Sequence, residues 1–535
     1  MRFPILKTTL ACVLTMGVLL LTACDGGKKP AGSTPAATTT TGNGQTTAPS
    51  EETSGSGTEV SSATDTQGPS DSGSADTKKP TSKAKTTTSR AGTVTTRRVT
   101  TVTQKPTTTT KAVVYPDPPN GNFAYQTSSF DKAGDMKFLA ARSESFTQGQ
   151  VKDVSAKPSG GIYNAKDFGA IPNDMADDSA ALNAAMRKVA SSGGVLYVPA
   201  GLYILTQPLT VPGGVNVHGD FTDVNNRNST VFLAYTGHGQ EDGTPLITMN
   251  GSSAMKGIEI YYPKQNKNAP VAYPPTFEVN GSDVGLEDIF AVNPWYAVKG
   301  VKDSGRHTIR NFYGQPLKTG IVIDHCLDVG RLRNVTFRSY WSANAAAYTR
   351  NNLTAYTFGK TDWEYVYDIY AENAKVGVRV TPLESTGNIL FNGADMRGCQ
   401  QSVLVDDCQA HAGVAFTDSV LEGQFATEYT NGGPVKVQNS VIRANAYKDI
   451  VMDLHGSGTV IVTGCTIDTA GGKNAAAWAV KINTDRSAFT GNTFTGKYTK
   501  HIYVDQSSLG AVLTGNAVTS GKLTVEDVSS GDCFY

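Results

Sequence analysis

The sequence lacks several features that would identify whole classes of protein at once. Its 535 residues contain only 7 cysteines, and acidic and basic side chains are equal in number. The neutral charge gives no sign of the basic face that nucleic acid requires. HExxH, GxSxG and helix-loop-helix calcium motifs are also absent from the sequence.

The few cysteines do not form a disulfide framework. Beyond the first 24 residues, an odd and scattered set remains: Cys326, Cys399, Cys408, Cys465 and Cys533. In a glycine-rich β domain such cysteines are expected to be small apolar core residues. A Cys399–Cys408 bridge is the alternative.

Aromatic residues are missing from a long stretch near the start. Residues 25–114 contain no Phe, Trp or Tyr and consist mainly of Thr, Ser, Gly, Pro and Ala. Such a segment buries too little apolar area to offset chain entropy, so we expect disorder. We therefore predict a stalk over residues 24–115, spanning roughly 50 Å as a flexible coil, and a folded domain over 116–535.

Residues 1–23 read as an export signal. Arg2 and Lys7 precede an apolar run too short for a membrane span. The sequence LTAC, ending at Cys24, resembles the bacterial lipobox, which implies that Cys24 is lipidated after cleavage. The predicted location is the outer face of a bacterial cell membrane, reached through a lipid anchor. The alternative is an ordinary secretory signal with a chance cysteine.

The folded domain opens with a helix between short strands, in residues 163–205. Asp177 and Asp178 are good N-cap residues, and the apolar residues of 182–189 form one helical stripe. Gly193 ends the helix, and strands follow at 195–198 and 203–205. We expect the helix over 178–192 to cover the open end of a stacked β structure.

The same residues carry a family resemblance. YNAKDFGA, then Asp177-Asp178-Ser179, then GGVLYVPAGLY resembles the opening of the pectate-lyase-like superfamily, which includes rhamnogalacturonase/epimerase-like domains and relatives of glycosyl hydrolase family 28. The resemblance implies an all-β, right-handed parallel β-helix and action on carbohydrate. Members include lyases, hydrolases, epimerases and tailspike proteins, so the reaction stays open.

Internal repetition supports a solenoid. A polar residue followed by a short strand recurs at Asp288, Asn311, Asn334, Asp368, Asn392, Asp418, Asn439, Cys465, Asn492 and Asn516. The gaps are 23, 23, 34, 24, 26, 21, 26, 27 and 24 residues, a spacing typical of one β-solenoid coil. These side chains are expected to stack as a hydrogen-bonded ladder. The gap of 34 predicts a long loop within residues 340–360.

Aligning the coils on these markers predicts a site. Asp328 and Asp362 fall at one position, and Glu364 aligns with His307 two coils away. Two clustered carboxylates are what glycoside hydrolysis requires, so the candidate catalytic residues are Asp328, Asp362 and Glu364. Strict alternation would instead turn all three inward, unless the chain turns between them and the strand.

The alternate positions of the alignment should face solvent. Ile309, Leu332, Val366 and Leu390 form the apolar, inward column. Outward residues suit a glycan, because arginine forks bind carboxylates and aromatic rings lie against sugar faces. The candidate substrate-binding residues are Arg310, Arg331, Arg333, Trp341, Trp363 and Tyr365. Trp341, in the inserted loop, is either a sugar platform or a loop anchor.

The sequence thus predicts a surface enzyme that cleaves a polysaccharide, with a hydrolase slightly favoured over a lyase. A non-catalytic glycan-binding or adhesive β-helix is the alternative from another class. No cofactor or resident metal is expected, although a lyase reaction would bring in Ca²⁺ as an alternative to arginine for neutralising the uronate. The expected partners are the polysaccharide and the membrane, with no nucleic acid.

Replacing Cys24 tests the lipid anchor. Cys24→Ala removes the acylated sulfur, so the protein should leave the membrane fraction and incorporate no labelled fatty acid. Cell fractionation with metabolic labelling measures both effects. A wild-type protein that stays on membranes without any label would contradict the lipobox prediction.

Overall fold

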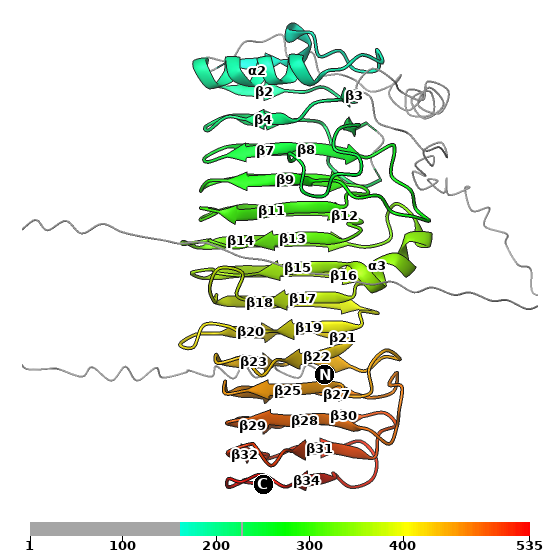
Figure 1. The fold of residues 1–535 in the computed structure, drawn as a ribbon, viewed down its shortest axis with the longest axis vertical. Helices are drawn as coiled ribbons and strands as arrows, with labels where there is room; N and C mark the ends of the chain where they lie inside the picture. Colours follow the sequence, from blue (N-terminus) through cyan, green and yellow to red (C-terminus); the bar gives the residue numbers. More distant parts are fainter. Residues whose placement is uncertain (1–160, 226–227) are drawn as a thin grey trace, which may run out of the picture. The chain divides into compact units, whose positions relative to one another are not determined.

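The computed structural model describes residues 161–225 and 228–535. The predicted signal, Cys24, the stalk and the 116 boundary lie outside the described residues. Within them the chain winds as an all-β, right-handed parallel β-helix (Figure 1), as predicted. Every strand pairing is parallel among the described residues, so each coil lies in register on the next.

The strands form two long sheets along the solenoid. The 13-stranded sheet contains β4 (Leu209–Val211), β7 (Ile247–Asn250), β9 (Pro275–Asn280), β11 (Tyr296–Lys302), β13 (Thr319–Ile323), β15 (Thr354–Phe358), β17 (Val376–Val380), β19 (Gln401–Val405), β22 (Gln424–Thr427), β25 (Met452–Gly456), β28 (Trp478–Thr484), β31 (Lys500–Val504) and β34 (Val525–Asp527). The 21-stranded sheet contains β1 (Ile162–Asn164), β2 (Val195–Tyr197), β3 (Gly201–Leu205), β5 (Asn216–His218), β6 (Thr230–Ala234), β8 (Ala254–Tyr261), β10 (Gly285–Ala291), β12 (Thr308–Gly314), β14 (Gly330–Phe337), β16 (Glu364–Glu372), β18 (Ile389–Arg397), β20 (Val414–Thr417), β21 (Val420–Glu422), β23 (Val435–Gln438), β24 (Val441–Arg443), β26 (Val460–Thr463), β27 (Thr466–Asp468), β29 (Ser487–Thr490), β30 (Thr493–Thr495), β32 (Ala511–Val512) and β33 (Ala517–Val518).

A column of left-handed residues bends the larger sheet. Asp288, Asn311, Asn334 and Asp368 have φ of 52°, 52°, 53° and 53°. Asn and Asp tolerate positive φ better than most residues. Asn311 Nδ2 donates to Asp288 Oδ1 at 2.7 Å, and Asn334 Nδ2 donates to Asn311 Oδ1 at 2.9 Å. The predicted polar ladder is confirmed in these coils.

Several later markers lie one position away from this column. The left-handed residues there are Gly393, Gly464, Gly491 and Gly515, whereas the markers were Asn392, Cys465, Asn492 and Asn516. Glycine adopts positive φ without strain, so the neighbouring polar side chain is free for other contacts. Asn492 Oδ1, for example, accepts the Cys465 N–H at 2.9 Å. The marker alignment is corrected by one residue at these coils.

The apolar core fills the interior along the solenoid. Ile309, Leu332 and Val366 are buried, as predicted, but the next member of their column is Phe391. Leu390, predicted to point inward, pairs with Tyr365 and is half-exposed. The reason is length: Glu364 pairs with Ile389, so this coil has 25 residues where the marker spacing gave 24.

Helix α2 (Ser179–Ser192) covers the N-terminal end of the solenoid (Figure 1). Its buried residues include the predicted stripe, Leu182, Ala185, Met186 and Val189. Asp178 precedes the helix but does not cap it through its side chain. Instead its carboxylate accepts the N–H groups of Ile171 and Ile204, which ties the helix start to the first coils.

The inserted segment contains a helix as well as a loop. The 3-10 helix η2 (Ala343–Ala345) continues into α3 (Ala346–Asn352), where the sequence predicted only a long loop. Alanine has the highest helix propensity, and Ser342 Oγ accepts the Asn344 N–H to cap the start. A second 3-10 helix, η1 (Ala165–Phe168), lies at the N-terminal end.

The five cysteines of the described residues are all free thiols. Four are buried and Cys533 is half-buried, so the alternative of a Cys399–Cys408 bridge is not realised. No helix within 161–225 and 228–535 is long and apolar enough to cross a membrane.

A charge on the buried side of α2 tests its role as a cap. Leu182→Asp should destabilise the solenoid by several kcal/mol, because an unpaired carboxylate would lie against the first coil. Ala190→Asp, on the exposed side of the same helix, is the matched control and should unfold near the wild-type temperature. Thermal denaturation measures the difference, and equal melting temperatures would remove the capping role.

Candidate functional site

An open cavity of about 560 Å³ lies over β10, β12, β14 and β16. Its lining residues are Glu287, Thr308, Arg310, Arg331, Arg333, Tyr367 and Asp368. The strand register stacks Glu287, Arg310, Arg333 and Tyr367 in one outward column, and Thr308, Arg331 and Tyr365 in the other. Neighbouring strands lie about 4.8 Å apart. The structure therefore brings the three predicted arginines together on one face.

At one end of the cavity, the basic side chains are paired with a carboxylate. Glu287 accepts hydrogen bonds from Lys256 Nζ, at 2.7 Å, and from Arg310 Nη2. Partial burial would raise the pKa of Glu287, but these two hydrogen bonds outweigh it and lower the pKa. Glu287 is therefore ionised and forms an ion pair with Arg310.

The other end of the cavity is positively charged. Among the described residues, no carboxylate lies within ion-pair distance of Arg331 or Arg333. The one hydrogen bond from the Arg331 side chain is a 3.4 Å contact with the Val329 carbonyl. Arg331 attracts Asp328 at longer range, but neither guanidinium forms an ion pair within the described residues. Two such groups side by side favour an anionic ligand, with which each forms a two-pronged contact.

Aromatic side chains border the arginines. The rings of Tyr365 and Tyr367 are stacked, with centroids 6.4 Å apart and planes at 16°. Tyr367 and Trp363 are partly exposed, at 41% and 38%. Flat exposed rings of this kind are suited to the apolar faces of sugar rings. Tyr365 thus lies beside Arg331, with which it pairs in the register, whereas Trp363 precedes β16 and is not among the residues that line the cavity.

Trp341 lies apart from this face. Its side chain is 8% exposed and packs in the core, so the indole ring has no face open to a glycan. Gln315 Oε1 accepts the N–H groups of Trp341 and Ser342, both at 2.8 Å. The prediction of Trp341 as a substrate-binding residue is therefore corrected, and the loop-anchor alternative agrees with its burial.

Asp362 is exposed and Asp328 is half-exposed, and both lie in turns, ahead of β16 and β14 respectively. Arg306 Nη1 donates to Asp328 Oδ2 at 2.8 Å, and the same guanidinium binds Asp283 on its other side. The Arg306 side chain and the Val329 N–H hold the pKa of Asp328 below its usual range. Neither Asp328 nor Asp362 is among the residues that line the cavity.

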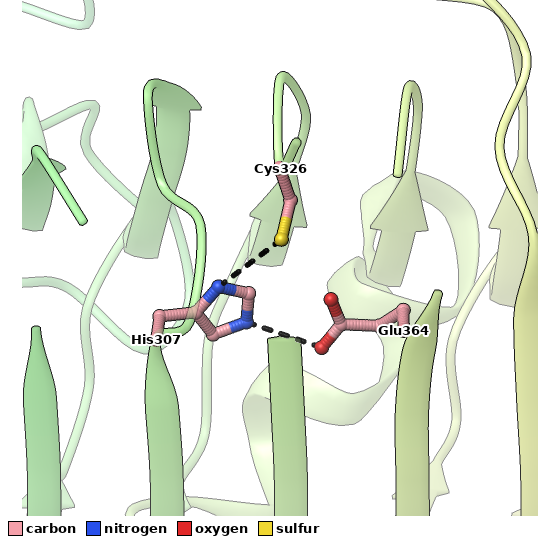
Figure 2. A group of neighbouring side chains, drawn as sticks. All are labelled: His307, Cys326 and Glu364. Atoms are coloured by element: carbon pink, nitrogen blue, oxygen red, sulfur yellow. Dashed lines mark hydrogen bonds and ion pairs between the residues drawn. The ribbon is translucent and has the colours of Figure 1, made fainter. Parts of the chain in front are cut away.

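Glu364, unlike these two aspartates, is not at the surface. Its side chain is 0% exposed and points into the solenoid, where Oε1 lies 3.1 Å from His307 Nε2 (Figure 2). The strict alternation of side chains along β16 explains this position. The prediction of three clustered catalytic carboxylates is corrected for Glu364, while its alignment with His307 is confirmed.

Gly330 makes the contact between His307 and Glu364 possible. The register places Gly330 in the coil between them. A Cβ atom there would lie 2.1 Å from Glu364 Oε2 and 2.4 Å from the His307 ring. Because Gly330 has no side chain, the two buried groups reach each other across one whole coil.

Cys326 completes a buried cluster with this pair. His307 Nδ1 lies 2.7 Å from the Ser304 carbonyl and 3.9 Å from Cys326 Sγ, and Sγ donates to the Asp328 carbonyl. Burial alone would lower the pKa of His307, but Glu364 outweighs burial and holds the pKa well above its ordinary value.

The sequence alignment missed Glu287 and the His307–Cys326 contact. Glu287 could have been predicted, because it occupies the position of Arg310 in the preceding coil. Cys326 belongs to a turn outside the aligned strands. Its approach to His307 depends on the path of that turn, for which the repeat pattern holds no signal.

Comparison with known proteins agrees with this architecture. Residues 162–379 match the family described as rhamnogalacturonase A/epimerase, pectate lyase-like. The match confirms the predicted resemblance to the pectate-lyase-like superfamily over these residues. No curated protein matches the chain at a significant level.

Solved β-helical structures are similar at low sequence identity. The A-module of mannuronan C-5 epimerase AlgE6 from Azotobacter vinelandii is 17% identical over 70% of this chain and 98% of its own, with a TM-score of 0.41. The surface adhesin PfbA of Streptococcus pneumoniae is 12% identical over 68% and 93%, with a TM-score of 0.43. The catalytic unit of a GH87 α-1,3-glucanase from Streptomyces thermodiastaticus is 14% identical over 70% and 71%, with a TM-score of 0.42.

Filling the space at Gly330 tests the buried cluster. Gly330→Ala should cost about 1–3 kcal/mol, because the new methyl group displaces both Glu364 and His307 from a packed interior. Gly432→Ala, where the nearest atom lies 3.8 Å away, is the control and should be near neutral. Chemical denaturation measures both variants, and equal stability would show that the cluster has room to spare.

Proposed function

We propose that this solenoid binds and cleaves an acidic, uronate-containing polysaccharide at the arginine-lined cavity. The observation that carries the proposal is the pair Arg331 and Arg333, which face the cavity without a carboxylate partner among the described residues. A uronate carboxylate satisfies both, because guanidinium forks and carboxylates match in charge and geometry. Tyr367 in the same lining offers a surface for the sugar ring.

The open shape of the site suits a polymer. The cavity extends over four consecutive strands, and Tyr365, which pairs with Arg331, continues the same face. A parallel sheet repeats its outward columns at a fixed spacing of about 4.8 Å, so a chain molecule laid across the coils meets similar groups repeatedly. An extended substrate uses this repetition, whereas a small ligand would contact one or two coils only.

The protonation of the carboxylates favours a lyase over the hydrolase. Hydrolysis by a carboxyl pair needs one member protonated near neutral pH. Glu287 and Asp328 both have lowered pKa values, and Glu364 is buried. Elimination instead needs cations that neutralise the uronate and a base for its C5 proton. Arg331 and Arg333 supply the cations, and Asp368, which lines the cavity without an ion-pair partner among the described residues, is the candidate base.

A panel of polysaccharides tests the reaction. The purified protein is incubated with polygalacturonate, rhamnogalacturonan, alginate and a neutral glucan, and both ultraviolet absorbance and reducing ends are followed. Elimination produces an unsaturated uronate that absorbs, together with reducing ends. Reducing ends without absorbance would instead support hydrolysis, the reaction that the sequence favoured. Binding without either product would instead support the non-catalytic glycan-binding alternative, which the burial of Glu364 favours.

Removing the free arginines should weaken binding of the acidic polymer. Arg331→Ala and Arg333→Ala each remove charge-assisted hydrogen bonds, which should lower affinity roughly ten- to a hundredfold, or about 1.5–3 kcal/mol. Calorimetry at low and high salt measures the change, since exposed ion contacts weaken with ionic strength.

Arg379→Ala is the matched control for this prediction. Arg379 is an exposed arginine of β17, in the other sheet, where it pairs with Asp406 at 2.7 Å. Its replacement should leave polymer binding unchanged. Equal losses in all three arginine variants would mean that binding depends on total charge, and the cavity would lose its assignment.

We further infer that the enzyme acts at the cell surface, held to the membrane by lipid on Cys24. This inference rests on the lipobox and the stalk composition, in residues outside the described part of the chain. A stalk of that length would let the solenoid reach polymer away from the membrane.

A further inference from the structure

We propose that His307, Cys326 and Glu364 form a structural binding site for one divalent transition-metal ion, with Zn²⁺ as the preferred ion. One ligand atom from each residue lies within 4.8 Å of the other two. Figure 2 shows the three side chains converging on one space inside the solenoid. This site stands apart from the arginine-lined cavity and does not depend on the proposed function.

An unsatisfied oxygen points to a missing partner. Glu364 Oε2 is buried and has no hydrogen-bond partner within the described part of the chain. A buried carboxylate oxygen left unpaired is costly, and native structures normally satisfy it. A metal ion beside the carboxylate would satisfy Oε2 and also balance the charge.

The orientation of the His307 ring is the one that metal ligands adopt. Its Nδ1 lies 2.7 Å from the Ser304 carbonyl, an arrangement in which Nδ1–H donates to the backbone. Histidine ligands commonly donate their second ring N–H to a carbonyl in this way, which directs the other nitrogen to the metal. His307 Nε2 is thereby presented to the space that Glu364 Oε1 borders at 3.1 Å.

The donor set matches zinc in softness and charge. Sulfur, imidazole nitrogen and carboxylate oxygen are all established zinc ligands. A thiolate and a carboxylate together balance a 2+ ion, and the thiol proton and one ring proton leave for solvent. Ligand atoms around tetrahedral zinc are roughly 3.3–3.8 Å apart. The distance from His307 Nε2 to Glu364 Oε1, 3.1 Å, is already close to this range. The adjustment therefore falls on Cys326, whose sulfur lies 3.9 Å from Nδ1 and must move toward Nε2.

Burial assigns the ion a structural role. His307, Cys326 and Glu364 are each 0% exposed, so no substrate reaches the site. Gly330 keeps the space open, because a Cβ atom there would occupy the position beside Glu364 Oε2. The ion would link the start of β12, the turn after β13 and the start of β16.

Metal analysis of the full chain tests the proposal. Protein purified without an affinity tag from zinc-supplemented cells should contain about one zinc per chain by mass spectrometry, as a closed structural site does. Cys326→Ser and Glu364→Gln should each reduce zinc to less than about a tenth of that. Cys399→Ser is the control, since Cys399 is also a buried free thiol, and it should keep the full zinc content.

Cobalt in the wild-type protein gives a readout that does not depend on the folding of any variant. Cells grown with Co²⁺ should yield protein with a thiolate-to-cobalt charge-transfer band in the near ultraviolet. The same band should persist in Cys399→Ser. Wild-type protein with neither zinc nor the cobalt band would overturn the proposal, as would a folded Cys326→Ser variant that retains its zinc.

Discussion

Parallel hydrogen bonding of each coil to the next is the constraint on which the rest of the structure depends. It stacks equivalent residues in columns, so the chemistry of one position is repeated along the solenoid. The left-handed column from Asp288 to Asp368 keeps the bend of each coil at the same place. A change of length between two coils therefore moves a whole column, and the longest insertion, which contains α3, lies in a turn.

The same register places two kinds of chemistry on opposite sides of one sheet. His307, Gly330 and Glu364 form an inward column, and the residues that follow them directly, Thr308, Arg331 and Tyr365, form an outward one. Alternation makes each buried group the neighbour of an exposed one. The buried cluster thus joins the same coils that carry the arginine face.

Sequence reasoning captured what is periodic and missed what is not. The capping helix, the coil length and the three arginines follow from spacing, and each was predictable. The one-residue error at Asn392 and Leu390 arose because coils differ in length by single residues, which composition does not reveal. The catalytic assignment of Glu364 failed for a related reason: parity decides whether a strand carboxylate faces substrate or core, and the alignment left that parity open at the turns.

The distribution of charge along the outward column argues for the position of the substrate anion. Lys256, Glu287 and Arg310 succeed one another in adjacent coils with alternating charge, and Glu287 binds both of its neighbours. The alternation then stops, because the next residue is Arg333 and the one after it is Tyr367. An anion placed against Arg333 would continue the alternating pattern and lie beside an aromatic ring. A uronate unit combines the carboxylate that Arg333 requires with the apolar sugar face that Tyr367 accepts. Under the proposed function, the uronate unit next to the point of reaction would therefore lie over β14 and β16, where Asp368 lines the cavity.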